Sequence, residues 1–340
     1  FADIRGVTSQ TAVAERRLEW EQVLGAAKWS AIGWPEKYGG RNADLAHQVI
    51  FAEEYARARA PGRLGHMGVE LAGPTILHFG NDTQRERFLP KMASGEEMWC
   101  QGYSEPGSGS DLASLQTAAT EDGDDFVING QKIWTSRAEH SDLMLLLART
   151  SPRREGMKKT HGLSVILVDM RKAVGNGLTI RPIRTMMNHA TTEVFFDNLR
   201  VPAENLIGEE GKGFKYILTG MNAERILIAA ECVGDAKWFT QKSVTYAKDR
   251  RVFDRAIGQN QGVQFPIAKA YTNMRAAELM VKEALRLYEA GENPGAEANM
   301  AKMLAADASF EAANACVQTH GGFGFAEEYD IERKFRETRL

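Results

Sequence analysis

One stretch of the sequence gathers glycines and hydroxyl side chains in a pattern that suits a cofactor. Residues 101–117 read QGYSEPGSGSDLASLQT and contain a Glu-Pro-Gly turn. Gly107 and Gly109 allow backbone N–H groups to come close to a ligand. Three serines add hydroxyl donors: Ser104, Ser108 and Ser110. Such a loop suits an electron-rich heteroaromatic ring or a pyrophosphate, although a Gly/Ser-rich surface turn would look the same.

A second stretch, residues 129–136 (NGQKIWTS), offers an aromatic wall beside a hydroxyl donor. Its Asn-Gly pair is a strong hairpin signal, so we expect a turn there between strands at 126–128 and 131–134. Trp134 and Ser136 would then stand together after the turn. Taken alone, Trp134 would more often be a core residue of a barrel.

Motifs for other chemistries are incomplete. The third glycine of a dinucleotide fingerprint that starts at Gly107 would fall on Leu112, which disfavours a Rossmann site. Residues 208–215 (GEEGKGFK) lack the Gly-Lys-Ser/Thr of a phosphate loop, and the His-Gly-Gly at 320–322 has no accompanying hydrolase elbow. No His-Glu-x-x-His or close histidine pair indicates zinc, so we expect no metal.

The composition is typical of a soluble globular protein. The chain has 340 residues, 43% of them hydrophobic and 26% charged, and its net charge of −3 gives no bias toward nucleic acid. No apolar run approaches the roughly 18 residues of a membrane span. Three widely spaced cysteines favour reduced thiols, as in the bacterial cytoplasm, and the mitochondrial matrix would also fit. The first residue is not Met, which leaves open that the chain is a fragment.

Rigid elements must position these polar stretches, and the hydrophobic pattern changes twice along the chain. Residues 1–98 read as helical, for example at 42–60, where apolar residues recur on one helix face. Residues 99–208 hold short strands with no helix between them, which favours an antiparallel barrel or sandwich. Residues 209–340 return to long helices, as in a four-helix bundle. We therefore expect an α+β protein with an N-terminal helical domain, a central β domain and a C-terminal helical bundle.

Two stripes in the last part are interpreted as core. The first comprises Tyr271, Met274, Ala277, Val281, Ala284 and Tyr288. The second comprises Met303, Phe310 and Val317. Their helical spacing favours packing over contact with a cofactor.

Together, the two polar stretches resemble the acyl-CoA dehydrogenase family. The family's flavin signature places a Ser/Thr before Glu-Pro-Gly-x-Gly-Ser-Asp, and Asn-Gly-x-Lys-x-Trp-Ile/Thr-Ser/Thr follows further on. This chain matches both in that order. The resemblance continues through residues 193–202 (EVFFDNLRVP), 204–208 (ENLIG), 250–253 (RRVF) and 318–325 (QTHGGFGF), so it covers nearly the whole chain.

The resemblance implies an FAD-dependent enzyme and assigns roles to single residues. Six would bind the cofactor: Tyr103, Ser104, Gly109, Ser110, Trp134 and Ser136. Ser136 would hydrogen-bond near N5, where the hydride arrives, and Ser110 would also lie near the substrate thioester. Five more would contact the FAD of a neighbouring subunit: Arg250, Phe253, Gln261, Gln318 and Gly322. The last group implies an oligomer, most simply a homotetramer.

The base is less well defined by the resemblance. Most of the family carries it in a Glu-Gly-Thr motif after an Arg-Asp-Ala-Arg-like stretch; residues 336–340 (RETRL) look like that stretch, and the chain then stops. The isovaleryl- and long-chain-type branch carries it on the first long bundle helix, directly before an Arg, and Glu224 followed by Arg225 matches that position. The base is therefore Glu224 or a residue beyond Leu340, and we prefer Glu224. Arg225 would then neutralise charge near the acyl-CoA, and Asn222 would touch the pantetheine arm.

The implied reaction oxidises an acyl-CoA to the trans-2-enoyl-CoA. A buried carboxylate of raised pKa removes the α-proton, hydrogen bonds to the thioester oxygen stabilise the enolate, and the flavin takes the β-hydride. An electron-transfer flavoprotein would then reoxidise the enzyme. One alternative is an acyl-CoA oxidase or another flavin oxidase of the same fold. The other is a non-catalytic or DNA-associated relative, for which the negative net charge gives no support.

Overall fold

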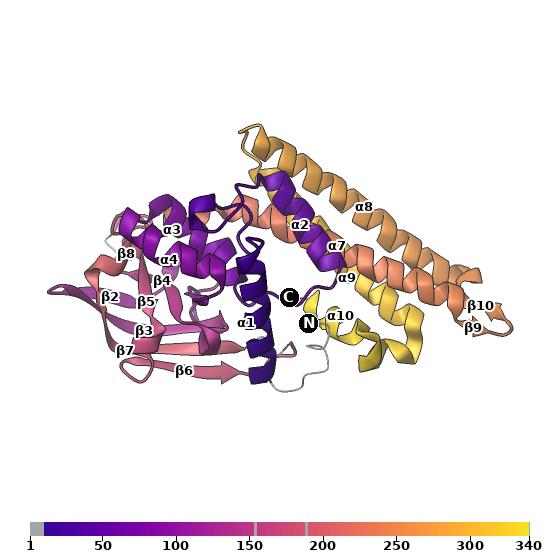
Figure 1. Ribbon diagram of the computed structural model, residues 1–340, viewed down its shortest axis with the longest axis horizontal. Coiled ribbons are helices and arrows are strands. Elements are labelled where there is room, and N and C mark those ends of the chain that lie inside the picture. The colour runs from indigo at the N-terminus through magenta and orange to yellow at the C-terminus, as the bar shows by residue number, and fades with distance from the viewer. Residues whose placement is uncertain (1–9, 153–154, 188–189, 340) are drawn as a thin grey trace. The chain divides into compact units, whose positions relative to one another are not determined.

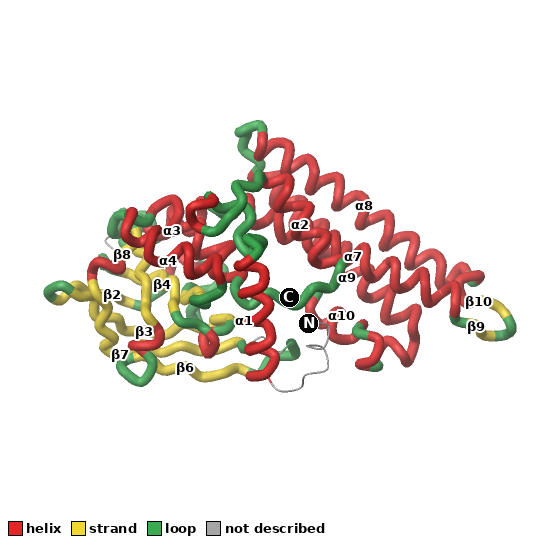
Figure 2. Tube along the Cα trace, viewed as in Figure 1, coloured by secondary structure: helices red, strands yellow, loops and turns green. Residues whose placement is uncertain are grey.

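The elements follow one another as helices, then strands, then helices again, so the expected α+β fold class is confirmed (Figures 1 and 2). The computed structural model describes residues 10–152, 155–187 and 190–339. In space the chain forms two compact units. Unit 1 comprises Phe1–Asn42 and Pro61–Gly220, and unit 2 comprises Ala43–Ala60 and Met221–Leu340.

Caps and glycines set the ends of the helices in unit 1. Helix α4 (Asp82–Ser94) begins with a capping box, in which the Asn81 side chain accepts from the Gln84 N–H (2.8 Å) and the Gln84 side chain accepts from the Asn81 N–H (3.0 Å). It ends at Gly95, which is left-handed (φ 75°). The other helical segments of the unit are α1 (Gln10–Ala26), η2 (Glu36–Tyr38), the π-helical η3 (Met67–Ala72), α3 (Gly73–Phe79), η4 (Leu112–Ser114), η5 (Ala138–His140), α5 (Met170–Ala173), η6 (Ala203–Asn205) and α6 (Gly213–Thr219).

Among the described residues, unit 1 contains an eight-stranded sheet in the order β6-β7-β3-β2-β4-β5-β8, with β1 paired to β4. Its strands are β1 (Trp99–Gly102), β2 (Ala118–Asp122), β3 (Asp125–Ser136), β4 (Leu143–Arg149), β5 (Leu163–Asp169), β6 (Leu178–Ile183), β7 (Thr191–Pro202) and β8 (Leu206–Ile207). The sheet is antiparallel as expected, except that β1 and one residue pair of β2 run parallel to β4.

Strands β4 and β5 are buried on both faces, which explains their continuous apolar sequence. On β4, Leu145 and Leu147 pack in a core shared with the helices of unit 1. Met144 and Leu146 point the other way, into a core formed by the sheet itself. The sheet therefore has an inner core and an outer helical cover.

The hairpin expected at Asn129 and Gly130 is wrong, because β3 runs through this pair as one strand. The chain turns earlier, where Asp122 pairs with Asp125 around the left-handed Gly123 (φ 65°).

A bulge uses the Asn-Gly pair instead of a turn. The register of β3 against β7 shifts between Ile128 and Gly130. Asn129 caps the bulge by accepting a hydrogen bond from the Asn198 N–H (2.8 Å). Gly130 is needed because a Cβ there would lie 2.6 Å from the side-chain oxygen of Thr117.

Unit 2 is a bundle of long helices that lie side by side (Figure 1). They are α2 (Leu45–Arg57), α7 (Met221–Asp249), α8 (Gln261–Glu289) and α9 (Gly295–His320). The short strands β9 (Arg251–Val252) and β10 (Arg255–Ala256) and the turn η7 (Ile257–Gln259) join α7 to α8, and η8 (Gly321–Phe325), η9 (Glu327–Tyr329) and α10 (Ile331–Glu337) follow α9. Backbones approach closely, since a Cβ on Gly234 would lie 2.3 Å from the Glu53 carbonyl oxygen.

The core stripe expected on α8 is correct in its centre, where four residues are buried: Met274, Ala277, Val281 and Ala284. Tyr271 and Tyr288, at its ends, are exposed. On α9 the expectation is wrong for Met303, which is 57% exposed. Alanines form the buried face of α9 instead: Ala298, Ala301, Ala305, Ala308, Ala312, Ala313 and Ala315. Small side chains let α9 pack closely against α7 and α8. The short distance between these helices therefore favours alanine on the buried face over larger apolar residues such as Met303.

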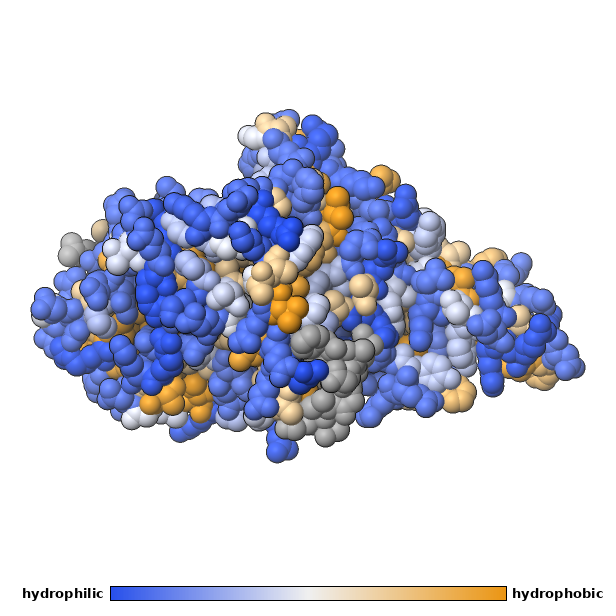
Figure 3. Space-filling view, viewed as in Figure 1, coloured by the Kyte–Doolittle hydropathy of each residue, from blue (hydrophilic) through white to orange (hydrophobic). Residues whose placement is uncertain are grey.

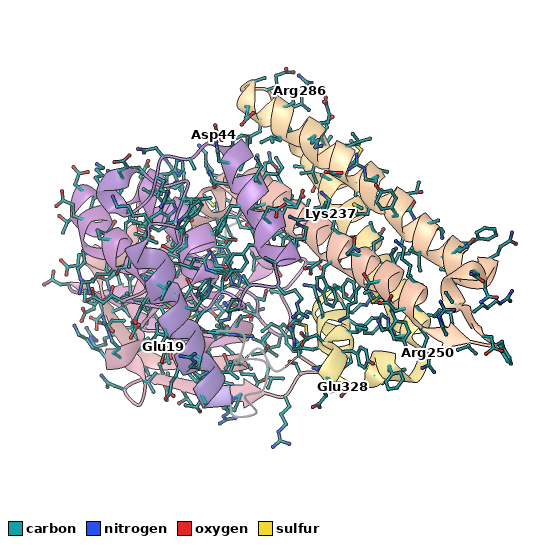
Figure 4. The ribbon with its side chains drawn as sticks, turned by 45° about the vertical axis from the view of Figure 1, so that its right-hand side comes forward. Glu19, Asp44, Lys237, Arg250, Arg286 and Glu328 are labelled. Atoms are coloured by element: carbon teal, nitrogen blue, oxygen red, sulfur yellow. The ribbon has the colours of Figure 1, made fainter. Side chains whose placement is uncertain are left out.

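A partly buried ion pair network joins three helices of the bundle. The Nζ atom of Lys237 on α7 lies 2.5 Å from Glu53 of α2 and 3.0 Å from Glu278 of α8. Figure 4 labels Lys237 along α7. Helix α2 is therefore joined to α7 and α8, which follow it much later in the sequence, through one ammonium group.

The surface shown in Figure 3 is mostly hydrophilic, with apolar residues in small separate groups. None of the described helices is long and apolar enough to cross a bilayer.

Candidate functional site

The first polar stretch forms a tight loop directly after β1. Glu105 and Ser108 exchange backbone hydrogen bonds of 3.1 and 3.0 Å, and the Ser108 hydroxyl lies 2.9 Å from that of Ser114. Gly107 and Gly109 form the exposed rim, where a Cβ on either residue would meet no described atom within 4 Å. The loop is therefore closed by its own bonds and presents bare backbone to open space.

The two polar stretches meet where β3 passes this loop. The N–H of Ile133 donates to the carbonyl oxygen of Ser104 at 2.9 Å. Four of the predicted cofactor residues flank this junction in the sequence. Tyr103 and Ser104 lie on the side of the loop, and Trp134 and Ser136 lie at the end of β3. The other two, Gly109 and Ser110, lie further along the same loop and are exposed.

Trp134 has an unusual conformation for so large a residue. It is left-handed (φ 61°) at a second register shift of β3, between Lys132 and Thr135, and it is 61% exposed. A bulky residue in this region is an outlier that costs roughly 1–3 kcal/mol and persists only where its surroundings impose it. An indole held outward at such a cost suits a flat aromatic ligand.

Arg137 follows Ser136 and was not predicted from the sequence. It is buried and left-handed (φ 64°), and its Nη1 donates to the Leu64 carbonyl oxygen (2.9 Å) and to His66 Nδ1 (2.7 Å). Burial lowers the pKa of Arg137 to about 10, so the guanidinium stays charged at neutral pH. It ties the end of β3 to the chain that leads into η3.

A second unpredicted group is the buried pair of Lys132 and Glu105, whose Nζ and Oε1 atoms are 2.9 Å apart. A sequence signal existed for the lysine. Residues of β3 alternate between inside and outside, and Lys132 is in phase with the buried Phe126 and Ile128. The alternation therefore points the lysine inward.

The predicted base lies on the first turn of α7, in unit 2. Glu224 is half-buried, as are Asn222 and Arg225. The Arg225 Nη1 donates to Asn222 Oδ1 at 3.2 Å, so the two predicted substrate-binding residues are in contact. A carboxylate in the first turn of a long helix is favoured by the helix dipole.

A pocket in unit 2 gathers three of the five residues predicted to meet a neighbour's FAD. Arg250, Gln318 and Gly322 line this cavity of ≈ 620 Å³, together with His320 and the left-handed Gly321 (φ 58°). Figure 4 shows Arg250 at the end of α7, next to the β9–β10 hairpin. A cation beside a glycine turn whose Cβ positions are open suits a phosphate group.

Phe253 and Gln261 lie outside the lining of that cavity. Phe253 occupies the turn between β9 and β10, left-handed (φ 53°) and 93% exposed. Gln261 is the exposed first residue of α8. A side chain as apolar and exposed as Phe253 favours contact with another molecule.

Each unit by itself supplies groups that suit a part of FAD. The loop of unit 1 supplies open glycine backbone, hydroxyls and an exposed indole for a flat ring. The cavity of unit 2 supplies a guanidinium and a glycine turn for a phosphate. Within the described ranges, no group of three or more His, Cys, Asp or Glu side chains could hold a metal ion.

Comparisons with known proteins identify relatives along the whole chain. The models of the N-terminal, middle and C-terminal domains of acyl-CoA dehydrogenase match residues 7–96, 100–199 and 211–340. The acyl-CoA dehydrogenase IpdE1 of Mycobacterium tuberculosis is 40% identical over 315 residues, which span 89% of this chain and 77% of the relative.

Solved structures agree with these matches. Butyryl-CoA dehydrogenase from Megasphaera elsdenii superimposes with a TM-score of 0.84 at 28% identity, covering 99% of this chain and 90% of its own. A chain in the structure described as an electron transferring flavoprotein of Acidaminococcus fermentans gives a TM-score of 0.86 at 30% identity, covering 99% and 90%.

Proposed function

Since this chain belongs to the acyl-CoA dehydrogenase family, we propose that it binds FAD and oxidises an acyl-CoA thioester to the trans-2-enoyl-CoA. The observation that carries the proposal is the junction of the two polar stretches through Ile133 and Ser104. It holds an exposed, strained Trp134 beside a loop of open glycines, which suits a tricyclic ring.

In this proposal, the residues of unit 1 hold and orient the cofactor. Tyr103, Ser104 and Trp134 contact the ring, and the Ser136 hydroxyl donates a hydrogen bond near its N5. Gly109 and Ser110 meet the phosphates, where the lack of a side chain at Gly109 lets the backbone approach. The bound FAD supplies the hydride acceptor.

The residues at the start of α7 act on the substrate. Glu224 takes the α-proton of the acyl group, and the neighbouring Arg225 and Asn222 bind the CoA thioester, with Ser110 near the thioester group. Apolar acyl chain and protein around the carboxylate would raise the pKa of Glu224 toward the working pH, as a general base requires. The hydrogen bond from Arg225 to Asn222 supports a shared role for these two residues.

The residues around the cavity of unit 2 serve a second copy of the chain. Arg250, Gln318 and Gly322 line the cavity, and the exposed Phe253 and Gln261 lie outside it. We propose that all five contact the FAD of a neighbouring subunit in a homotetramer. A sizing column with light-scattering detection measures the oligomeric state directly.

We infer that an electron-transfer flavoprotein accepts the electrons. The likeness to a chain in the flavoprotein structure from Acidaminococcus fermentans supports this choice. A flavin oxidase is the competing function, and oxygen consumption during turnover would identify it. Reduced cysteines at positions 100, 232 and 316 are consistent with the bacterial cytoplasm, with the mitochondrial matrix as the alternative compartment.

Anaerobic bleaching tests the proposal. The purified protein should be yellow, and an acyl-CoA should bleach its flavin absorbance without oxygen. Glu224→Gln should keep FAD but bleach more slowly by several orders of magnitude. The matched control is Glu297→Gln, a half-buried carboxylate in the first turn of α9, which should bleach at the wild-type rate.

Each outcome separates two parts of the proposal. A colourless protein that takes up no added FAD would rule out the flavin enzyme. A yellow Glu224→Gln variant that bleaches normally would instead move the base to the alternative position beyond Leu340.

A further inference from the structure

A lysine occupies the interior of the β region beside the loop that follows β1. The side chain of Lys132 is 0% exposed. Its Nζ donates two hydrogen bonds of 2.9 Å, one to the carbonyl oxygen of Tyr103 and one to Glu105 Oε1. The stem lies in apolar surroundings, because a Cβ on Gly102 would contact both Lys132 Cγ (3.5 Å) and the sulfur of Met144 (2.7 Å).

The carboxylate of Glu105 also reaches the far end of the same loop. It accepts hydrogen bonds from the backbone N–H groups of Gln116 (2.7 Å) and Thr117 (2.8 Å). The loop between Tyr103 and Thr117 is therefore closed around one ion pair. Hydrogen bonds to charged groups are shorter and stronger than neutral ones, so this closure is tight.

Stability alone does not account for such a pair. Moving a lysine out of water costs several kcal/mol, and apolar residues of the same size often replace buried ion pairs without loss of stability. Burial lowers the pKa of Lys132 to about 8, against the opposing effect of Glu105. Burial acts to raise the pKa of Glu105, but the charge of Lys132 and hydrogen bonds from Thr117, Lys132 and Gln116 lower it overall. Both groups are therefore charged at neutral pH.

The pair touches both halves of the junction described above. Lys132 donates to Tyr103 of the first polar stretch. It also lies on β3, shortly before Trp134 and Ser136 of the second stretch. The neighbouring hydrogen bond also has its donor on β3 and its acceptor on the loop, since the Ile133 N–H donates to the Ser104 carbonyl oxygen. A shift of the ammonium would therefore change the position of residues 103–104 relative to residues 134–136.

We propose that Lys132 is a positioning residue for the flavin: its ammonium, paired with Glu105, sets the spacing between residues 103–104 and residues 134–136 before the ring binds. Lys132 acts through the loop and does not touch the ring. The inference rests on the proposed function, since it takes FAD to be the ligand.

The test is Lys132→Met, which keeps most of the length and an apolar stem but removes the charge. The readouts are the dissociation constant for FAD, measured on apoprotein by flavin fluorescence, and the fine structure of the visible flavin absorbance. We expect FAD to bind at least about tenfold more weakly, with less fine structure in its visible absorbance band. The reason is that the spacing between residues 103–104 and residues 134–136 is no longer set before the ring binds. The melting temperature of the apoprotein should also fall, because Glu105 loses its buried partner, so both readouts are taken well below that temperature.

Lys237→Met is the matched control, because it removes a lysine from a charged network of unit 2, whereas the loop belongs to unit 1. It should lower the melting temperature of the apoprotein and leave the FAD dissociation constant and spectrum at wild-type values, when measured well below the melting temperature. A purely structural role for Lys132 would give this control pattern, and that result would overturn the proposal.

Glu105→Gln provides a second route to the same answer. It keeps one oxygen acceptor, so it should weaken FAD binding less than Lys132→Met, and the double variant should bind no more weakly than Lys132→Met alone. If Lys132→Met does not fold, Glu105→Gln decides the question with the same readouts. Wild-type protein that binds no FAD would sink the proposed function, whereas variants with wild-type FAD affinity and spectrum would sink only this inference.

Discussion

The imidazole of His320 lies against the phenol ring of Tyr246, with ring centroids 4.0 Å apart and planes 27° from parallel. His320 Nδ1 is 2.8 Å from the carbonyl oxygen of Cys316, so Nδ1 carries the proton and donates. Burial lowers the pKa of His320 below its usual 6.5, with a smaller contribution from the charge of Lys242. The fold therefore prefers the neutral imidazole at the wall of the unit 2 cavity.

Acid should destabilise this wall. Because the folded-state pKa of His320 is lowered, the stabilising contribution is complete above pH 6.5 and is lost as the pH falls through the folded value. His320→Phe keeps the ring stack but cannot titrate. At pH 7.5 the variant should be less stable than the wild type, and the gap between their melting temperatures should narrow as the pH is lowered to 5.

His78→Phe is the control for that experiment. His78 Nδ1 also bonds to the carbonyl four residues earlier (Pro74, 2.7 Å), but on an exposed helix face. Its melting temperature over the same range shows what replacing an exposed imidazole by a phenyl ring does by itself. A His320→Phe gap that stays level between pH 7.5 and pH 5 would contradict the prediction.

Removing the ammonium that joins α2, α7 and α8 should weaken unit 2. Lys237→Met leaves Glu53 and Glu278 partly buried without their shared cation, so we expect a loss of roughly 2–3 kcal/mol in the free energy of unfolding, below that of a fully buried pair. Urea unfolding followed by circular dichroism measures it. Adding Glu278→Gln should recover part of the loss.

The control is the exposed ion pair of Arg286 and Glu283 on α8. Arg286→Met should leave unfolding almost unchanged, because solvent screens that pair. Equal losses of unfolding free energy in the two variants would show that the Lys237 network stabilises the protein no more than an exposed ion pair does.

Trp134→Gly should separate stability from function. Glycine adopts the left-handed conformation without strain, and the exposed indole buries little surface, so stability should be unchanged or higher by up to about 1 kcal/mol. FAD binding and the rate of flavin reduction should fall. Trp134→Ala keeps the strain and should lose function without the gain in stability; a stable Trp134→Gly with full activity would contradict the proposed role of the indole.

Gly109→Ala should act on the ligand and spare the fold. The added Cβ meets no described atom within 4 Å and the residue is not left-handed, so the unfolding free energy should stay within about 0.5 kcal/mol of wild type. If backbone approaches the cofactor here, FAD should bind more weakly. Gly123→Ala is the converse control: its strained φ of 65° should lower stability while FAD binding is retained.

Sequence patterns predicted the order of elements well because period and composition are local properties. The apolar run at 143–147 became β4, and the buried stripe of α8 was correct at Met274 and Val281. The errors came from tertiary packing. The distance between α9 and its neighbours selected alanines over Met303, and pairing with β7 drew residues 129–130 into a bulge.

Motifs in the sequence name candidate site residues, but they do not name the contacts between those residues. Tyr103, Ser104 and Trp134 could be proposed from the two polar stretches. The bond from Ile133 to Ser104 that joins those stretches depends on strand register, which no motif states. Arg137 was missed because its partners, Leu64 and His66, come from a distant segment.

The placement of α2 has a consequence for biosynthesis. Leu45 and Val49 belong to the core of unit 2, yet their main partner α7 is translated only after the whole β region. The nascent chain therefore carries an amphipathic helix whose partner α7 has not yet been made while the ribosome completes the intervening strands. Chaperones that scan emerging chains should engage residues 45–57 first, and release should coincide with the emergence of α7.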